Sequence, residues 1–506
     1  MIKLYMAAEE YEQDIRPLVK SFFPDEELEV VYTAYAGAIE MLQLQEEDKG
    51  ICFLTEETQF RLFYVQKSEV LDKEEKQLEK SAIDFTEENA AVRWHKYYRD
   101  EVKRALYRLL SRVTGKTLPW GTLTGIRPTK QVLEKLEEGA AEEEIRTLFT
   151  EKYYCSTEKQ DLSLQVAKKE LALLQDLDYK ESYSLYIGIP FCPTTCLYCS
   201  FTSYPLEKFQ KYTDAYVEAL KKEIAYAAEC FPHKKLVTIY FGGGTPTTLS
   251  PEQLRDVIQT VKKHLPLEHV REWTVEAGRP DSITEEKLRV LLEEGITRIS
   301  INPQTMQQKT LDLVGRRHSV EQIVEAFHLA RKMGFDNINM DLIIGLTGED
   351  AADVRDTLRQ IKQLSPDSVT VHTLALKRAA RLNAEKDQYK EQKATGVKEM
   401  LQASVAFAKE NGYEPYYLYR QKNMAENLEN VGYARDGKEG LYNILIMEEK
   451  HTILALGAGA STKFVFPDGK RIERVENVKS LLDYIGRIDE MIERKKTFLQ
   501  SVEGKL

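Results

Sequence analysis

The sequence predicts an α/β fold, a partial parallel (β/α)6 TIM-like barrel flanked by an N-terminal α+β region and a C-terminal mixed α/β domain. Six short strand-like runs follow one another, at residues 184–190, 237–243, 272–277, 298–304, 337–345 and 368–376. Between them, segments such as 212–229 and 320–334 carry apolar residues at every third or fourth position, which is typical of amphipathic helices. Strands that alternate with helices form a parallel sheet through right-handed crossovers, and the chemistry of such barrels lies at the C-terminal strand ends.

Three regions are expected along the 506 residues: an accessory region at 1–180, the barrel at 181–380 and a C-terminal domain at 381–506. In the first region, the runs 28–37, 50–57 and 60–66 suggest a small α+β module, and the charge-rich stretch 71–90 is interpreted as a solvated helix surface. Helical spacing predicts one helix over 90–115. The Pro- and Gly-containing segment 118–130 is a predicted loop. Its Trp120, Arg127 and Lys130 either line a pocket or pack a domain junction, and we favour the second interpretation.

The last region is expected to begin with a helix within 382–412 that stops at Gly412. Three apolar runs after it, at 414–420, 442–449 and 451–459, are predicted as strands.

Composition excludes several classes of protein. The net charge of −11, from 82 acidic and 71 basic residues, disfavours a general nucleic-acid coat. No run of about 18 apolar residues occurs, so no membrane span is expected. The first residues, MIKLYMAAEEYEQD, do not resemble a secretory signal. Six cysteines are too few for a disulfide scaffold, which leads us to expect a protein of the reducing cytoplasm.

Three of the six cysteines lie close together, directly after the first barrel strand. Cys192, Cys196 and Cys199 have the spacing Cys-x3-Cys-x2-Cys, which suits three irons of one [4Fe–4S] cluster and leaves the fourth iron open. A zinc site would need a fourth ligand, and no Cys or His follows at a suitable distance. The isolated cysteines are expected to be core residues: Cys52, Cys155 and Cys230.

The cysteine segment IPFCPTTCLYC and the following strand end YFGGGTPT resemble the radical S-adenosylmethionine (SAM) superfamily. The closer resemblance, over residues 186–375, is to its oxygen-independent coproporphyrinogen III oxidase (dehydrogenase) family. The segment LTGIRPTK in the N-terminal region resembles the HemZ-type branch. A phosphate-binding loop is the rival interpretation of the glycines, but no Gly-Lys-Ser/Thr follows them.

The resemblance implies that the three cysteines ligate the cluster and that the open iron chelates SAM. It also implies SAM contacts for residues at successive strand ends: Tyr186, Tyr198, Gly243, Gly244, Thr245, Glu276, Gln304, Arg316, Asp341 and Ala375. Glycine allows backbone groups to approach the methionine end of SAM, and Arg316 is expected to neutralise its carboxylate. The residues leave open whether one or two SAM molecules bind.

The implied reaction begins with reductive cleavage of SAM, and the resulting 5′-deoxyadenosyl radical abstracts a hydrogen atom from a propionate β-carbon. Carbon dioxide and an electron then leave, so that coproporphyrinogen III becomes protoporphyrinogen IX. The implied partners are this tetrapyrrole and a cellular electron donor such as flavodoxin or ferredoxin, and the chain is expected to act as a monomer. Lys377, Arg378 and Arg381 are candidates for binding propionates, or they form an exposed charged loop.

The chain also departs from the family pattern. Phe201 stands where family members carry a further cysteine. One alternative is therefore a haem chaperone, although its His-Asn-x-x-Tyr-Trp motif is replaced here by residues 442–447, and nearby His451 is interpreted as structural. A radical SAM enzyme that acts on another substrate is a further alternative.

Overall fold

The structure is a computed structural model that describes residues 1–7, 9–24, 26–33, 48–67, 69–83, 89–125, 127–375, 380–385, 394–420, 428–469 and 471–502. The chain divides into two compact units. The first comprises Met1–Gln165 with Arg420–Asn427, and the second comprises Val166–Tyr419 with Leu428–Leu506.

The N-terminal unit is a five-stranded sheet of order β2-β1-β3-β4-β5 with helices packed against it. Its strands are β1 (Ile2–Met6), β2 (Leu28–Tyr32), β3 (Lys49–Thr55), β4 (Gln59–Gln66) and β5 (Glu69–Gln77). Its helices are α1 (Glu12–Phe22), α2 (Ala90–Thr114), α3 (Lys130–Glu137), α4 (Glu142–Glu151) and the first part of α5 (Thr157–Leu174). The single helix expected over 90–115 is confirmed as α2.

The interpretation of the charge-rich stretch 71–90 as a helix surface is wrong for the first part of that stretch. Residues up to Gln77 belong to β5, which pairs antiparallel with β4. Alternate side chains of β5 are exposed, so an edge strand with one face toward water accommodates the charges as well as a helix would.

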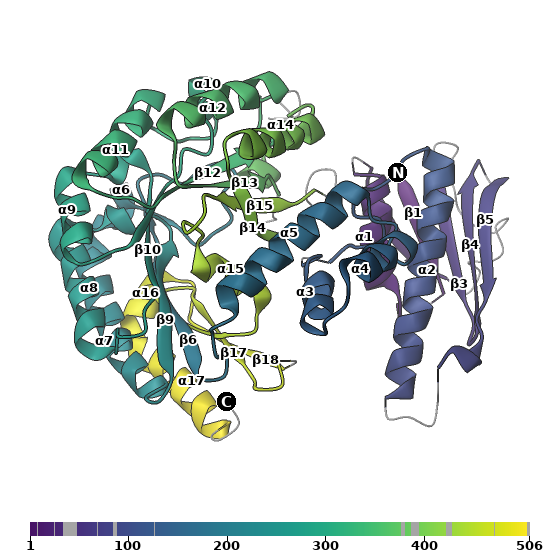
Figure 1. The fold of residues 1–506 in the computed structure, drawn as a ribbon, viewed down its shortest axis with the longest axis horizontal. Helices are drawn as coiled ribbons and strands as arrows, with labels where there is room; N and C mark the ends of the chain where they lie inside the picture. Colours follow the sequence, from purple (N-terminus) through teal and green to yellow (C-terminus); the bar gives the residue numbers. More distant parts are fainter. Residues whose placement is uncertain are drawn as a thin grey trace. The chain divides into compact units, whose positions relative to one another are not determined.

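The second unit contains the predicted parallel barrel strands in one open sheet (Figure 1). They are β6 (Ser182–Ile189), β9 (Lys235–Gly243), β10 (Glu272–Gly278), β11 (Arg298–Ile301), β12 (Ile338–Ile344) and β13 (Ser368–Thr373). They are neighbours in chain order, and every neighbouring pair is parallel. The predicted (β/α)6 arrangement is therefore confirmed.

Helices cover the outside of this curved sheet in Figure 1: α7 (Thr213–Cys230), α8 (Pro251–His264), α9 (Glu285–Glu293), α11 (Val320–Met333) and α12 (Ala351–Leu364). Local sequence explains where several of them begin. Ser250, Ser319 and Asp350 are N-caps, and each forms a capping box with the residue three positions later. α11 ends at Gly334, whose φ of 114° suits a residue without a Cβ.

Shorter elements join these parts: β7 (Phe191–Cys192), β8 (Tyr204–Pro205), α6 (Leu206–Phe209), α10 (Gln308–Leu313) and α13 (Arg381–Ala384), with 3-10 turns at Lys80–Ala82, Gln210–Tyr212, Pro246–Thr248 and Pro280–Ser282. The C-terminal elements are α14 (Val397–Glu410), β14 (Glu414–Tyr419), β15 (Asn430–Ala434), α15 (Leu441–Glu448), β16 (Thr452–Leu456), β17 (Ser461–Val465), β18 (Ile472–Glu476), α16 (Leu481–Gly486) and α17 (Ile488–Ser501). Their strands extend the same sheet at both edges, and β16 pairs parallel with β6.

The run 442–449, predicted as a strand, is instead helical, as α15. A short apolar run fits either a buried strand or a buried helix, so the local pattern did not distinguish them. The first turn of α15 is satisfied from elsewhere in the chain, because the Glu272 carboxylate accepts hydrogen bonds from the backbone N–H groups of Leu441 (2.6 Å) and Tyr442 (3.2 Å).

Side chains alternate along the barrel strands and divide them into two faces. On β6, Leu185, Ile187 and Ile189 are completely buried. Tyr186 points to the other face, where its ring stacks with that of Tyr240 from β9. This inner face carries the polar and aromatic side chains that form the site.

Candidate active site

The cysteine segment forms a loop at the C-terminal end of β6, and backbone hydrogen bonds attach it to two other parts of the barrel. The Leu197 N–H donates to the Val314 carbonyl at 2.9 Å, and the Leu382 N–H donates to the Leu197 carbonyl at 2.9 Å. The side chains of Leu197, Val314 and Leu382 pack together with Leu346 in one apolar cluster. Backbone hydrogen bonds thus fix the segment between Cys196 and Cys199 to two separate parts of the chain.

An arginine that the sequence analysis did not single out also holds this loop. Arg279 donates to the carbonyl (3.1 Å) and to the hydroxyl (2.6 Å) of Thr194, while Asp281 accepts from the same guanidinium at 3.0 and 2.6 Å. The Thr194 hydroxyl lies 2.9 Å from the Gly315 carbonyl. The paired and forked contacts of Arg279 restrict the orientation of the loop.

The glycines at the end of β9 face the first cysteine. Gly243 has a φ of 107°, and a Cβ on Gly244 would lie 2.5 Å from the Phe191 carbonyl oxygen and 3.0 Å from Cys192 Sγ. The Thr245 hydroxyl is 3.7 Å from the same sulfur. The strand end therefore forms a closely fitted cradle around Cys192.

Arg316 reaches the second cysteine from the other side of the loop. Its guanidinium is buried and donates to the Asn302 carbonyl, to the Tyr198 hydroxyl at 3.3 Å and to Cys196 Sγ at 3.9 Å. Its Nε has no hydrogen-bond partner among the described residues. The structure thus places the Arg316 guanidinium beside Tyr198 and Cys196 of the cysteine loop, and their predicted contacts with SAM stay a prediction.

The predicted carboxylates lie on the inner face of the barrel. Glu276 accepts a hydrogen bond from the Tyr240 hydroxyl at 2.5 Å, and burial raises the pKa of Glu276 to about 7. Asp341 accepts from the Asn339 amide at 2.7 Å, and its carboxylate lies 4.0 Å from Nε2 of His372. Polar groups from β9, β10, β12 and β13 thus converge on one interior surface.

Gln304 follows β11 and forms an isolated bridge with Leu342 of β12, and its backbone has an unusual conformation. Its φ is +68°, its N–H donates to the Asp341 carbonyl at 2.9 Å, and its carbonyl accepts from the Ile343 N–H at 2.9 Å. Its side-chain Oε1 is buried and has no partner among the described residues. A strained residue that presents an unsatisfied acceptor is suited to a ligand that supplies a donor.

The remaining predicted positions are less informative. Ala375 follows β13 by two residues and is partly exposed. Lys377 and Arg378 lie outside the described residues. Arg381 begins α13 beside Leu382, and its guanidinium approaches the Glu385 carboxylate at 3.2 Å.

The three thiols of the cysteine loop suit an iron–sulfur cluster, because Cys thiolates are the ligands that hold such clusters. Burial raises the pKa of Cys192 to about 12 and raises that of Cys199 as well; Cys196 adds to both shifts, and Cys199 adds to that of Cys192. Buried thiols of this kind become thiolates when a strongly positive group such as iron binds them. The cradle at Gly244 and the unpartnered Gln304 Oε1 agree with a bound cofactor.

Three aromatic residues of the site were not found from the sequence. Tyr240 and Tyr442 stack with ring centroids 4.4 Å apart, and Tyr419 contacts His372 through a 3.0 Å hydrogen bond. Tyr240 had a usable signal, because it belongs to the strand that ends in the predicted Gly243 and Gly244. Tyr442 and Tyr419 come from the C-terminal part of the chain and had no such signal.

Comparison with known proteins agrees with this geometry. Residues 186–361 match the model of the radical SAM superfamily. Over 426 residues, 83% of this chain and 84% of its relative, the chain is 42% identical to the oxygen-independent coproporphyrinogen-III oxidase-like protein HemZ of Bacillus subtilis. The chain belongs to this radical SAM family. It is a radical SAM enzyme of the coproporphyrinogen oxidase-like type, and its family uses a [4Fe–4S] cluster and SAM.

Two further similarities support the assignment to the family. The haem chaperone HemW of Bacillus subtilis is 30% identical over 60% of this chain and 76% of its own length. The solved structure of coproporphyrinogen III oxidase (HemN) from Escherichia coli, a radical SAM enzyme, matches with a TM-score of 0.50 and 25% identity over 63% of this chain and 73% of that one.

Of the residues named for the chaperone alternative, His451 has structural surroundings, and Tyr442 packs against other aromatic residues of the site. His451 is buried between the hydroxyls of Ser182 (3.3 Å) and Ser184 (3.0 Å), and burial lowers its pKa to about 3. Tyr442, at the position of the chaperone motif, is buried in α15. The chaperone alternative is therefore not better supported than the oxidase-like one.

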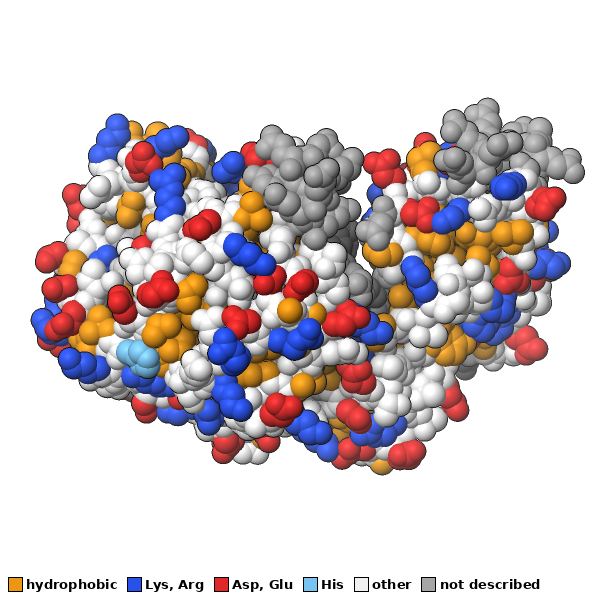
Figure 2. Space-filling model, turned by 90° about the horizontal axis from the view of Figure 1, so that it is seen from above, with side chains coloured by type: hydrophobic (Ala, Val, Ile, Leu, Met, Phe, Trp, Pro, Cys, Tyr) orange, Lys and Arg blue, Asp and Glu red, His pale blue; other side chains and the backbone are white. Residues whose placement is uncertain are grey.

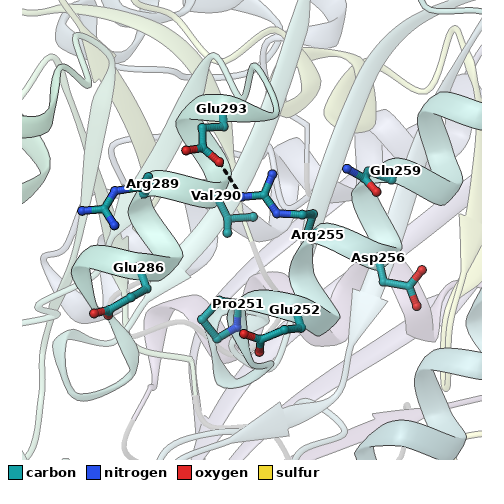
Figure 3. Close-up of a pocket in the computed structure, with 9 residues that line it drawn as sticks. All are labelled: Pro251, Glu252, Arg255, Asp256, Gln259, Glu286, Arg289, Val290 and Glu293. Atoms are coloured by element: carbon teal, nitrogen blue, oxygen red, sulfur yellow. Dashed lines mark hydrogen bonds and ion pairs between the residues drawn. The ribbon is translucent and has the colours of Figure 1, made fainter.

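One surface hollow of the second unit is lined mainly by charged side chains. A cavity of about 390 Å³ between α8 and α9 is lined by charged side chains, and Figure 3 shows Arg255 turned toward Glu293, with which it forms an ion pair. The face seen in Figure 2 has acidic and basic side chains interspersed. Among the described helices, none is long and apolar enough to cross a membrane.

Proposed function

We propose that this enzyme converts propionate side chains of coproporphyrinogen III to vinyl groups and thereby forms protoporphyrinogen IX. The observation that carries the proposal is the 42% identity to a coproporphyrinogen-III oxidase-like protein over 83% of the chain. Each conversion removes a hydrogen atom, a carbon dioxide and one electron, so a terminal electron acceptor is also required.

We assign the three cysteines, Cys192, Cys196 and Cys199, to cluster ligation. When bound, the cluster and SAM supply a carbon-centred radical that abstracts hydrogen from the substrate. The position of the Arg316 guanidinium beside Cys196 supports a contact with the SAM carboxylate, since a fork of donors suits that group. The unpartnered Oε1 of Gln304 supports a contact with a SAM donor group.

The other predicted SAM contacts are part of the same proposal. The close approach of Gly243, Gly244 and Thr245 to the cysteine loop supports a backbone surface for the methionine end of SAM. The inner-face positions of Tyr186, Glu276 and Asp341 support contacts along the rest of the molecule, with Tyr198 and Ala375 at its edges. The number of SAM molecules bound per chain, one or two, is to be measured from the binding stoichiometry.

Propionate recognition requires cations near the cysteine loop. The position of Arg381 supports such a role, because the next residue, Leu382, donates its N–H to the carbonyl of Leu197 in that loop. Lys377 and Arg378 precede it by a few residues. The carboxylate of Glu385 now neutralises Arg381, and a substrate propionate would compete for the same guanidinium.

We further infer that the enzyme acts as a monomer in the cytoplasm and receives electrons from a flavodoxin or ferredoxin. A reducing compartment is supported by the small number of cysteines, six in 506 residues, which is too few for a disulfide scaffold.

The test is a strictly anaerobic assay of the cluster-loaded enzyme with SAM, a reductant and an electron acceptor, run with and without coproporphyrinogen III. 5′-Deoxyadenosine and tetrapyrrole masses are followed together. Loss of two carboxyl groups coupled to 5′-deoxyadenosine formation is the expected result. 5′-Deoxyadenosine without a change in the tetrapyrrole would refute the substrate, and absence of SAM cleavage with tight haem binding would favour the chaperone.

Two cysteine variants separate the cluster from the fold. Cys196→Ala is expected to lose the cluster absorbance and iron together with SAM cleavage. Cys230→Ala changes a buried cysteine on α7, outside the loop, and is expected to keep all three. Equal iron content in the two variants would contradict the assignment of Cys196 as a ligand.

A further inference from the structure

The N-terminal unit contains a small basic cavity that the proposed reaction does not use. Its volume is about 110 Å³, and its lining includes Lys96, Arg99, Asp100 and Lys103 of α2, together with Thr122 and Lys152. The α2 residues are spaced three, four and seven positions after Lys96, so they share one face of the helix. We call this space the basic cavity.

Positive charge exceeds negative charge in the basic cavity. Asp100 accepts from Arg99 at 3.2 Å and from Lys152 at 3.0 Å, and Arg99 lies 3.8 Å from Asp14 outside the lining. Neither Lys96 nor Lys103 forms an ion pair with any carboxylate of the described residues. Two of the four lining cations are therefore left without a counter-ion.

Of these two lysines, Lys103 gives the stronger evidence for a bound anion. Its ammonium donates to the Thr124 hydroxyl at 3.2 Å, and burial lowers its pKa to about 8. The carboxylates of Asp14 and Asp100 oppose this shift, and the positive charges of Arg99 and Arg420 add to it. Removing a cation from water without a partner is costly, and the enclosing loop offers Lys103 a neutral hydroxyl in place of a carboxylate. An anion in the cavity would offset this cost.

The wall opposite α2 is closely packed. It includes Thr122 and Leu123, which follow the fully buried Trp120, and the Thr122 N–H donates to the Tyr153 carbonyl at 2.8 Å. Gly121 has a φ of +55°, and a Cβ there would overlap that same carbonyl. Arg420 lies over the Trp120 ring, 5.6 Å from its centroid, and donates to the Leu123 carbonyl at 2.6 Å. A cavity with such walls does not collapse easily around its lysines.

The size of the cavity restricts its ligand. A space of about 110 Å³ suits one compact group and not a whole tetrapyrrole. Ammonium and guanidinium donors are the usual partners of phosphate and carboxylate oxygens. We propose that the basic cavity binds the oxyanion group of a ligand, a phosphate or a carboxylate.

The test measures binding of sodium phosphate and of sodium propionate to the cluster-loaded 506-residue chain by titration calorimetry at constant ionic strength. We expect at least one anion to bind the wild type and to bind Lys103→Met about tenfold or more weakly, as for loss of a charged hydrogen bond. Lys96→Gln, which changes an exposed side chain, is a second variant that keeps the fold and should weaken binding several-fold. Lys135→Gln on α3, an exposed lysine paired with Glu138, is the matched control and should bind like the wild type.

Each outcome of the anion titration either identifies the bound group or overturns the proposal. Binding of phosphate alone identifies phosphate as the group, and binding of propionate identifies a carboxylate. If neither anion binds, or if the Lys103 and Lys96 variants bind as tightly as the wild type, the proposal is overturned. The measurement does not depend on SAM cleavage, so its failure leaves the proposed reaction untouched.

Discussion

Replacing Gly244 with alanine tests the close fit between the end of β9 and the cysteine loop. The added Cβ would lie 2.5 Å from the Phe191 carbonyl oxygen, 2.9 Å from the Pro190 carbonyl carbon and 3.0 Å from Cys192 Sγ. All three neighbours belong to the segment that leads into the cysteines. Because two of them are backbone atoms, rotation of a side chain does not relieve the overlap.

The size of the effect follows from these distances. Ordinary contact begins at 3.4 Å, so the loop and the strand end must separate by 3.4 − 2.5 = 0.9 Å at the tightest point. Overpacking of this kind costs about 1–3 kcal/mol of stability, and displacement of a reacting group by about 1 Å slows catalysis by about 100-fold. We expect Gly244→Ala to remain folded and to cleave SAM about 100-fold more slowly.

The assay compares iron content, cluster absorbance and the initial rate of 5′-deoxyadenosine formation in the wild type and two variants. Gly486→Ala is the matched control, because a Cβ at Gly486 would meet no atom within 4 Å. This control should retain the wild-type rate. A Gly244→Ala enzyme with full iron content and a wild-type rate would refute the argument that the cradle positions the cluster.

Three other substitutions give distinct results. Lys495 and Glu223 form a buried ion pair at 2.7 Å, so Lys495→Met leaves the Glu223 carboxylate buried without its cation. This variant should lower the free energy of unfolding by about 3–5 kcal/mol in denaturant titrations. Adding Glu223→Gln to it should recover much of that loss. Burial raises the pKa of Glu276 from 4.5 to about 7, so the native state holds this proton more tightly than the unfolded chain and stability falls as the pH rises from about 4.5 to about 7. Glu276→Gln should abolish that part of the slope in unfolding measurements at pH 5 and pH 8, and an unchanged slope would contradict it. Arg316→Lys loses the planar fork of donors and should weaken SAM binding about tenfold in equilibrium titrations, with iron content unchanged.

The order of the barrel strands and the position of the cysteine loop were predictable because their signals are local. Alternation of short apolar runs with amphipathic helices implies parallel neighbours, and the structure has them in that order. The spacing of Cys192, Cys196 and Cys199 carries its chemistry within eight residues. The candidate residues Glu276, Gln304 and Asp341 meet in space because parallel strands end at the same edge of the sheet.

Two segments were assigned to the wrong element, and each depended on a partner elsewhere in the chain. The run that contains α15 is helical where Glu272, about 170 residues earlier, accepts hydrogen bonds from its first turn. The charged residues of β5 form a strand because β4 offers a complete antiparallel partner. Local patterns alone cannot distinguish these outcomes, since tertiary contacts override weak propensities.

The sequence by itself determined the family, the barrel and the cysteine loop, because the signal for each is the spacing of residues that are neighbours along the chain. Only the tertiary structure decided which groups surround them: Tyr240 on Glu276, Arg279 on the loop, and the lysines of α2 that face the loop at 118–130. These contacts join positions far apart along the chain. Their strength comes from burial and geometry, which arise only when the whole chain has folded.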